Sequence, residues 1–132
     1  MSKQKVKGVG PDAPIVTNEK GGKQSRSPFR CDLLPAQATL AVAGVLAYGA
    51  ERYGDNNWRK GYAWSLSYDA LCRHLAQFWD GEDYDEETGS KHIIAVAWHA
   101  IALATFMDEQ PGKDDRFESP NKANAVEAET IT

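Results

Sequence analysis

The chain has 132 residues, of which 42% are hydrophobic and 26% are charged, and its formal net charge is −4. These values are typical of one soluble globular domain, and the net charge argues against a nucleic-acid binder. The N-terminus has no apolar segment of the signal-peptide kind, and no apolar run reaches the roughly 18 residues of a membrane span. We therefore expect a cytoplasmic protein whose two distant cysteines, Cys31 and Cys72, are free thiols.

Both ends of the chain are poor in large apolar residues. Residues 1–27 mix Lys, Gly, Pro, Ser and Asn, and residues 1–30 carry seven Lys and Arg against two acids. Residues 111–132 have a similarly polar composition. Because such segments bury too little apolar surface to offset the entropy lost on ordering, we predict a flexible basic arm over 1–27 and a flexible tail over 111–132. The predicted folded unit is residues 28–110.

Three helices are expected within this unit, which predicts an all-α fold: a small helical bundle of about three main helices. The first begins near Pro35 and stops at Gly54, because proline suits a first helical turn. The second runs from about 67 to 80, and the third from about 91 to 108.

The apolar surface of these helices exceeds what three of them can cover. The second helix has one apolar stripe at helical spacing, which we expect to face the core: Tyr68, Leu71, Cys72, Leu75, Phe78 and Trp79. The first and third helices are apolar around most of their circumference, so we expect the first helix to be largely buried. We therefore expect a homo-oligomer, a dimer or a tetramer, that buries the excess between subunits.

The segment between the second and third helices is rich in acids, with five in the six positions 82–87. Most such runs are solvated surface. If the second helix continued, however, His74, Phe78 and Glu82 would form one row on the edge of its apolar face, and Glu82 would point inward. Glu82 and Asp85 are also spaced like two carboxylates one helical turn apart, which suits Mg²⁺ or Mn²⁺. Both the solvated and the metal-binding interpretation remain open.

The three histidines also allow two interpretations. His92 and His99 lie two turns apart on the third helix, and His74 lies on the second. A histidine on an apolar face is more often a hydrogen-bonded core residue than a ligand, which applies to His74 and His99. His92 opens the third helix directly after the acids and could orient a carboxylate or contact phosphate.

The loop between the first and second helices could contact a nucleotide. Asn56 and Asn57 offer amides for a base edge, Trp58 a stacking surface, and Arg59 and Lys60 two cations for phosphate. The alternative is a helix–helix loop anchored by a core tryptophan.

Five short motifs occur in an order that resembles a known family. They are Arg30-x-Asp32-Leu33-Leu34-Pro35, the run 48–54 (YGAERYG), the run 57–61 (NWRKG), Arg73-His74-Leu75, and the run 81–92 (GEDYDEETGSKH). Together they resemble the phage-type dATP/dGTP diphosphohydrolases, a branch similar to the MazG-like all-α pyrophosphohydrolases. A phage-encoded member would act in the host cytoplasm.

The resemblance implies metal-dependent hydrolysis of a purine deoxynucleoside triphosphate to the monophosphate and pyrophosphate, with Mg²⁺ or Mn²⁺, in a helical oligomer. It implies metal ligands at Glu82, Asp85 and Glu87, which with His92 would form the catalytic set. It also implies that Arg59, Lys60 and Arg73 contact phosphates, and that His74 and His92 either contact phosphate or support the metal ligands. Together with the loop residues proposed above, the predicted substrate-binding residues are Asn57, Trp58, Arg59, Lys60, Arg73 and His74. Two features depart from the pattern. The chain lacks the Glu-Glu-x-x-Glu helix of MazG-like enzymes, and Ala95 stands where the branch often has a second histidine.

Two alternatives belong to other functional classes. One is a non-enzymatic helical interaction protein whose basic arm binds nucleic acid or an acidic partner. The other is a metal hydrolase that acts on pyrimidine nucleotides or a phosphoribosyl compound. The sequence leaves open the choice between dATP and dGTP, the sugar and the number of metal ions.

Overall fold

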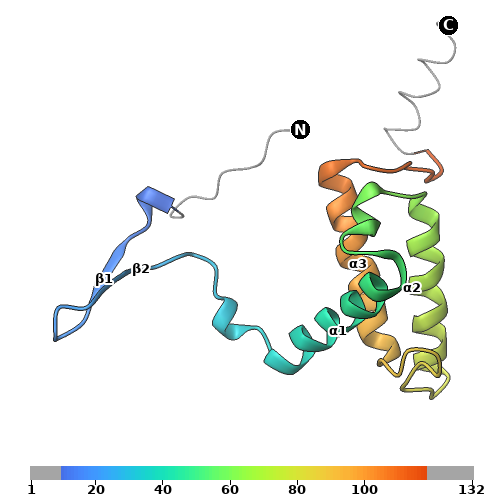
Figure 1. The fold of residues 1–132 in the computed structure, drawn as a ribbon, viewed down its shortest axis with the longest axis horizontal. Coiled ribbons are helices and arrows are strands. Elements are labelled where there is room, and N and C mark those ends of the chain that lie inside the picture. Colours follow the sequence, from blue (N-terminus) through green and yellow to red (C-terminus); the bar gives the residue numbers. More distant parts are fainter. Residues whose placement is uncertain (1–9, 119–132) are drawn as a thin grey trace, which may run out of the picture. The chain divides into compact units, whose positions relative to one another are not determined.

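Three α-helices dominate the structure, a computed structural model that describes residues 10–118 (Figure 1). They are α1 (Ala36–Tyr53), α2 (Trp64–Trp79) and α3 (His92–Glu109). The predicted helices are confirmed, with ends that differ from the expected ones by at most three residues. The chain divides into two units, residues 1–36 and residues 37–132.

The first unit contains a short hairpin that the sequence pattern did not predict. Strands β1 (Ile15–Thr17) and β2 (Lys23–Ser25) pair antiparallel, with Val16 opposite Gln24. Asn18 organises the turn, because its Oδ1 accepts hydrogen bonds from the amides of Lys20 (3.0 Å) and Gly22 (2.7 Å). The prediction of an arm without strands is therefore wrong for residues 15–25. Residues 1–9 of the predicted arm lie outside the described residues, as do residues 119–132 of the predicted tail.

In the second unit, α2 and α3 pack side by side and run in opposite directions (Figure 1). Their shared core holds Trp64, Ala70, Ala95, Ala102 and Phe106, all less than a tenth exposed. Three of these five are alanines, which allow the two helix backbones to approach closely. Two polar residues, Ser67 and His92, are buried in the same interface.

The face of α2 that packs on α3 is not the predicted one. Tyr68 is 64% exposed, Leu75 44% and Trp79 87%, although all three belong to the apolar stripe expected to face the core. The buried side of α2 instead carries Trp64, Ser67 and Ala70. The prediction of the inner face is wrong because small and polar residues make this contact while larger apolar ones remain on the surface.

Helix α1 is also apolar and exposed. None of its residues, all of which are described, is buried, and Leu40 is 70% exposed. The prediction that this helix is largely buried is therefore wrong for the single chain. None of the helices within residues 10–118 is long and apolar enough to cross a membrane.

The segment after α3 lies against the start of α2, although its first residues were assigned to the predicted flexible tail. The Trp64 amide donates to the Lys113 carbonyl (3.1 Å), and the Ser65 amide donates to Asp115 Oδ1 (3.0 Å). Asp115 thus accepts from a free amide in the first turn of α2, as a capping side chain does. The ordered unit extends past residue 110 because the N-terminus of α2 needs these acceptors.

The segment after α3, residues 111–116, is called the return segment below. Two glycines allow it to pass close to residues 61 and 62, just before α2. Gly61 has a φ of +86°, and a Cβ there would collide with the backbone of Pro111 and Gly112. A Cβ at Gly112 would collide with the backbone of Tyr62. The crossing is therefore restricted to residues without a side chain.

We expect Gly61→Ala to lower the free energy of unfolding by about 2–3 kcal/mol, because the alanine would be strained at this φ and its methyl group would displace the return segment. Urea denaturation followed by circular dichroism measures the change. The matched control is Gly44→Ala in α1, where a Cβ meets no described atom within 4 Å. This control should gain about 0.5–1 kcal/mol from helix propensity. Similar losses in both variants would contradict the steric explanation.

Candidate functional site

The acid-rich segment between α2 and α3, residues 80–91, is called the connector below, and it folds back on itself. Gly81, with a φ of +99°, ends α2. The Asp85 amide then donates to the Ser90 carbonyl (2.8 Å), and the His92 amide donates to the Asp83 carbonyl (3.0 Å). These bonds carry Asp85 back toward the ends of both helices. Helix α2 ends at Trp79, close to the expected end, so Glu82 lies beyond the helix and does not extend the row of His74 and Phe78.

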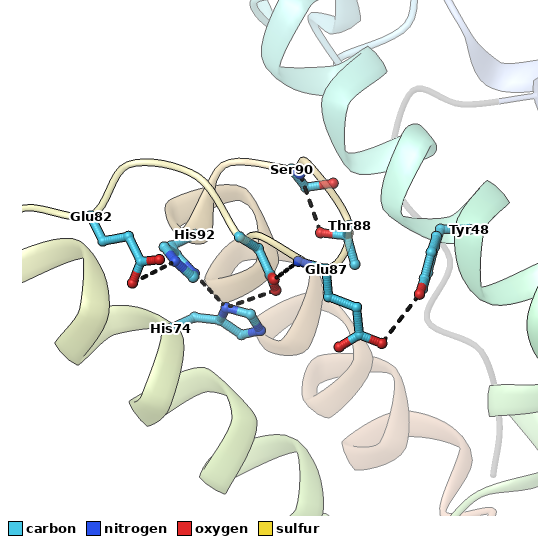
Figure 2. A network of polar contacts seen from close by, with 8 residues as sticks. Tyr48, His74, Glu82, Glu87, Thr88, Ser90 and His92 are labelled. Carbon is cyan, nitrogen blue, oxygen red and sulfur yellow. Dashed lines mark hydrogen bonds and ion pairs between the residues drawn. The ribbon is translucent and has the colours of Figure 1, made fainter.

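Two histidines and a carboxylate meet where the connector returns (Figure 2). His74 Nδ1 lies 2.9 Å from His92 Nδ1 and 4.0 Å from Asp85 Oδ2. The side chains are largely shielded from solvent, with 14% exposure for His74, 21% for Asp85 and 2% for His92. Imidazole nitrogens and a carboxylate oxygen gathered in this way form a potential metal-binding group, which we call the His–Asp cluster: His74, Asp85 and His92.

The second ring nitrogen of His92 points the other way, toward Glu82 (Figure 2). His92 Nε2 lies 3.5 Å from Glu82 Oε2, and it is a buried atom with no hydrogen-bond partner within residues 10–118. A buried nitrogen without a partner is costly, so the Glu82 carboxylate is the group available to compensate it. Glu82 therefore faces His92. It does so from the connector and not from a continued helix α2.

Glu87, the third predicted metal ligand, points to a different element. Its Oε1 accepts from the Tyr48 hydroxyl of α1 (3.3 Å; Figure 2). It also accepts from Arg52 Nη1 (3.2 Å), one turn further along α1. Asp85 Oδ1 accepts from the Glu87 backbone amide (2.8 Å), so the Asp85 carboxylate contacts the backbone of Glu87 and not its side chain. The structure thus brings Glu82, Asp85 and His92 together and leaves the Glu87 side chain at α1.

A second polar chain lies two turns away in the same helix pair. The buried Ser67 hydroxyl lies 2.6 Å from the Tyr62 hydroxyl and 3.0 Å from His99 Nδ1. The His99 ring stacks on His74, with ring centroids 6.2 Å apart. The interpretation of His99 as a hydrogen-bonded core residue is therefore supported by its contacts. Ser67 and Tyr62 were not singled out in the sequence, because a serine and a tyrosine without a motif carry no signal of such a chain.

Burial lowers the pKa of two of these histidines. The pKa of His99 falls to about 4, mainly through desolvation and further through His74 and Arg73. The pKa of His74 is also lowered, first by burial, while nearby Asp85 acts in the opposite direction. Both rings are therefore neutral at pH 7, the form in which an imidazole can accept a hydrogen bond or bind a metal ion.

We expect the His99 shift to make the fold sensitive to mild acid. The pKa of His99 is about 4 in the folded chain and about 6.5 when unfolded, so the unfolded state binds the proton first. The stabilising contribution is thus complete above pH 6.5 and is lost as the pH falls toward 4. Allowing for partial exposure, the free energy of unfolding should drop by about 1–2 kcal/mol between pH 7 and pH 5.

Urea unfolding at both pH values, with EDTA present, measures this effect. The control is His99→Gln, which removes the titrating group and should show a smaller pH dependence than the parent chain. An equal pH dependence in the two proteins would show that other groups cause it.

The loop before α2 borders a cavity of about 680 Å³. Its walls come from α1, from the loop and from α3, where Trp98 and His99 contribute. Asn57, Trp58 and Arg59 all line it, as does Asn56. The Trp58 ring is half-buried, meets Trp98 edge-to-face at 4.8 Å, and has the Arg59 guanidinium 4.7 Å from its centre. Trp58 therefore both anchors the loop and borders the cavity.

The remaining predicted substrate contacts lie elsewhere. Lys60 is exposed at the end of the short helix Asn57–Lys60. Arg73 pairs with Asp69 one turn away on α2 (3.2 Å), and both side chains are exposed. Arg30 and Asp32 form a two-bonded pair within the first unit, at 2.9 and 2.7 Å.

The sequence of this chain matches that of a known protein family. Residues 18–116 match the sequence model of the family described as dATP/dGTP diphosphohydrolase, N-terminal. The chain belongs to this family. The match to the dATP/dGTP diphosphohydrolase N-terminal family spans all three helices, the connector and the return segment, so the resemblance noted in the sequence is confirmed.

A curated relative gives the scale of the similarity. A protein of Salmonella phage PMBT28 named dATP/dGTP diphosphohydrolase is 32% identical over 93 residues, which are 70% of this chain and 31% of the relative. The chain thus spans about a third of the length of the relative it matches. No solved structure gives a significant match to this member of the family.

Proposed function

We propose that this chain hydrolyses a purine deoxynucleoside triphosphate, dATP or dGTP, to the monophosphate and pyrophosphate with the help of a divalent metal ion. The observation that carries the proposal is the buried group at the α2–α3 connector, where His74, Asp85 and His92 meet and Glu82 adjoins. The family description and the name of the phage relative supply the substrate class.

The residues at the connector fit a divalent metal ion. They offer carboxylate oxygens and imidazole nitrogens, and one ligand atom from each of His74, Asp85 and His92 lies within 4.8 Å of the others. When bound there, such an ion would neutralise phosphate charge and make a water molecule more acidic. Mg²⁺ and Mn²⁺ are the ions that the resemblance implies.

The cavity suits the base of the substrate. Trp58 and Trp98 provide aromatic surface, and Asn56 or Asn57 could read the edge of a purine. The cavity and the His–Asp cluster adjoin through His99, which lines the cavity and stacks on His74. A nucleotide with its base near Trp58 would extend its phosphates toward the cluster, and Arg59 could contact them.

A carboxylate can act as the base that removes a proton from the attacking water. Glu82 is the most exposed of the acids at the cluster, at 42%, and it lies beside His92. We propose that a carboxylate that is not bound to the metal ion, such as Glu82, accepts this proton while the water attacks the α-phosphorus and pyrophosphate leaves. Glu87, which binds α1, is not assigned a part in this step.

We further propose that the chain acts as a homo-oligomer in the cytoplasm. Large apolar side chains are exposed on both α1 and α2, among them Leu40, Tyr68 and Trp79, and a second subunit could cover them. Size-exclusion chromatography with light scattering tests this proposal. A dimer or tetramer at micromolar concentration would support it, and a strict monomer would contradict it.

The decisive experiment is product analysis by chromatography. The purified chain is incubated with each dNTP and NTP in Mg²⁺ or Mn²⁺, with an EDTA control. Monophosphate and pyrophosphate from dATP or dGTP, abolished by EDTA, would support the proposal. Orthophosphate as the first product would contradict attack at the α-phosphorus.

The alternative is a non-enzymatic protein whose basic arm binds nucleic acid. It predicts no hydrolysis of any nucleotide and salt-sensitive DNA binding that is lost when residues 1–27 are deleted. The same preparations can therefore decide between the two functions.

A further inference from the structure

We propose that the direct metal ligands are His74, Asp85 and His92, with His92 binding through Nδ1. Glu82 does not touch the metal ion; its carboxylate faces Nε2 on the opposite side of the His92 ring and orients that ring. This assignment rests on the proposed function for its role in catalysis, but metal binding itself can be measured separately. It also predicts which ions bind: transition metals such as Mn²⁺, Co²⁺ and Zn²⁺ more tightly than Mg²⁺.

The first step concerns the side of each ring. The Nδ1 atoms of His74 and His92 face each other at 2.9 Å, and Asp85 Oδ2 lies on the same side, 4.0 Å from His74 Nδ1. One ligand atom from each of the three residues lies within 4.8 Å of the others. Three donors on two helices and one connector thus converge on one small volume.

The second step concerns the opposite side of the His92 ring. A neutral imidazole carries one N–H, so a ring that offers the Nδ1 lone pair to a metal ion carries its hydrogen on Nε2. In this structure, Nε2 is buried, lacks a hydrogen bond within the described residues, and lies 3.5 Å from Glu82 Oε2. A carboxylate behind a metal-binding histidine commonly fixes its tautomer and raises its basicity. Glu82 occupies the position that this role requires.

The third step concerns the ion. Two of the three assigned donors are imidazole nitrogens, which suit zinc, copper, iron and nickel better than magnesium, whose usual ligands are oxygens. A site built from Glu82, Asp85 and Glu87 would have been all-oxygen, but Glu87 is bound to α1 and Glu82 adjoins His92. Of the two ions expected from the sequence, Mg²⁺ and Mn²⁺, the donor set therefore favours the transition metal.

Isothermal titration calorimetry on the full chain, stripped with EDTA, tests the assignment with MnCl₂, ZnCl₂ and MgCl₂ as probes. His74→Gln and Asp85→Asn should each weaken Mn²⁺ binding by more than about 100-fold. Glu82→Gln should weaken it by only about 10–100-fold, the range for a residue that orients a ligand. The matched control is Glu86→Gln, which removes one charge from an exposed position of the same connector and should leave the affinity unchanged.

A second readout is the absorption of bound Co²⁺ in the visible range. The wavelength and intensity of this absorption depend on how many imidazole nitrogens bind the ion. The spectrum should therefore change in His74→Gln, which removes one nitrogen ligand, and remain the same in Glu82→Gln. Circular dichroism confirms that each variant is folded, and these variants avoid replacing the buried His92.

The outcomes separate the two proposals. Mn²⁺ binding that depends on His74 supports the ligand assignment even if no nucleotide is hydrolysed, a result that would overturn only the proposed function. Hydrolysis that persists with unchanged metal affinity in His74→Gln overturns the assignment alone. Binding lost as completely in Glu82→Gln as in Asp85→Asn, or Mg²⁺ bound more tightly than Mn²⁺, overturns it as well.

Discussion

Asp85→Asn is expected to lower the rate of dATP or dGTP hydrolysis at least ~100-fold while the chain remains folded. Asp85 provides the one carboxylate that lies on the same side as the facing Nδ1 atoms of His74 and His92. Asparagine has nearly the same shape but no charge, so it binds a divalent ion far more weakly. The loss should therefore exceed the roughly 10–100-fold typical of residues that only orient a ligand.

The substitution also preserves the local fold. Asp85 Oδ1 accepts from the Glu87 amide (2.8 Å), and an asparagine carbonyl can accept the same bond. The backbone bonds of Asp85 to Ser90 and Gly89 do not involve the side chain. Initial rates of pyrophosphate release measure the effect, with Glu86→Gln as the variant that changes the connector charge equally. Comparable losses in both variants would indicate a general charge effect and would remove Asp85 from the site.

Phe106→Ala should cause the largest loss of stability, about 3–5 kcal/mol. Phe106 is completely buried and is the largest apolar side chain in that state. Its ring meets Tyr62 edge-to-face at 5.1 Å and lies 6.1 Å from Trp58. Removal would leave a cavity where α3 supports both the loop before α2 and the wall of the candidate base pocket.

The neighbouring Met107→Ala is the control, because Met107 is on the same helix and 57% exposed. It should change the free energy of unfolding by less than about 0.5 kcal/mol. Urea denaturation of both variants gives the comparison. A loss below about 1 kcal/mol for Phe106→Ala would mean that the ring is not held in a packed core.

The sequence predicted the helices well because their ends are chemically marked. Pro35 precedes α1, Gly54 follows it, and Gly81 ends α2, so each limit was expected within three residues of its observed position. The inner face of α2 was predicted wrongly for a physical reason. Hydrophobic periodicity locates the large apolar side chains, whereas α2 meets α3 through Ser67 and Ala70, which are too small to contribute to that pattern.

The candidate site could be predicted in composition but not in geometry. Glu82, Asp85 and His92 were expected to act together, and the folded connector brings them together. The position of His74 against His92 and the binding of Glu87 to α1 depend on how the connector folds back. No spacing rule specifies a turn closed by the bonds from Asp85 to Ser90 and from His92 to Asp83.

The hairpin of β1 and β2 was missed because its three-residue strands are exposed throughout, so no apolar residues alternate along them.

The buried polar pairs between α2 and α3 form two rungs with the same spacing on both helices. Ser67 pairs with His99, and seven residues further along α2 His74 meets His92, which lies seven residues before His99 on α3. A slip of α2 by one turn, about 5.4 Å, would separate both rungs and leave their polar atoms buried without partners. Apolar surfaces of alanine would tolerate such a slip. The contacts among Tyr62, Ser67 and His99 thus fix the register of α2 against α3. When α2 and α3 are aligned correctly at this end of the pair, the residues of the His–Asp cluster meet at the other end.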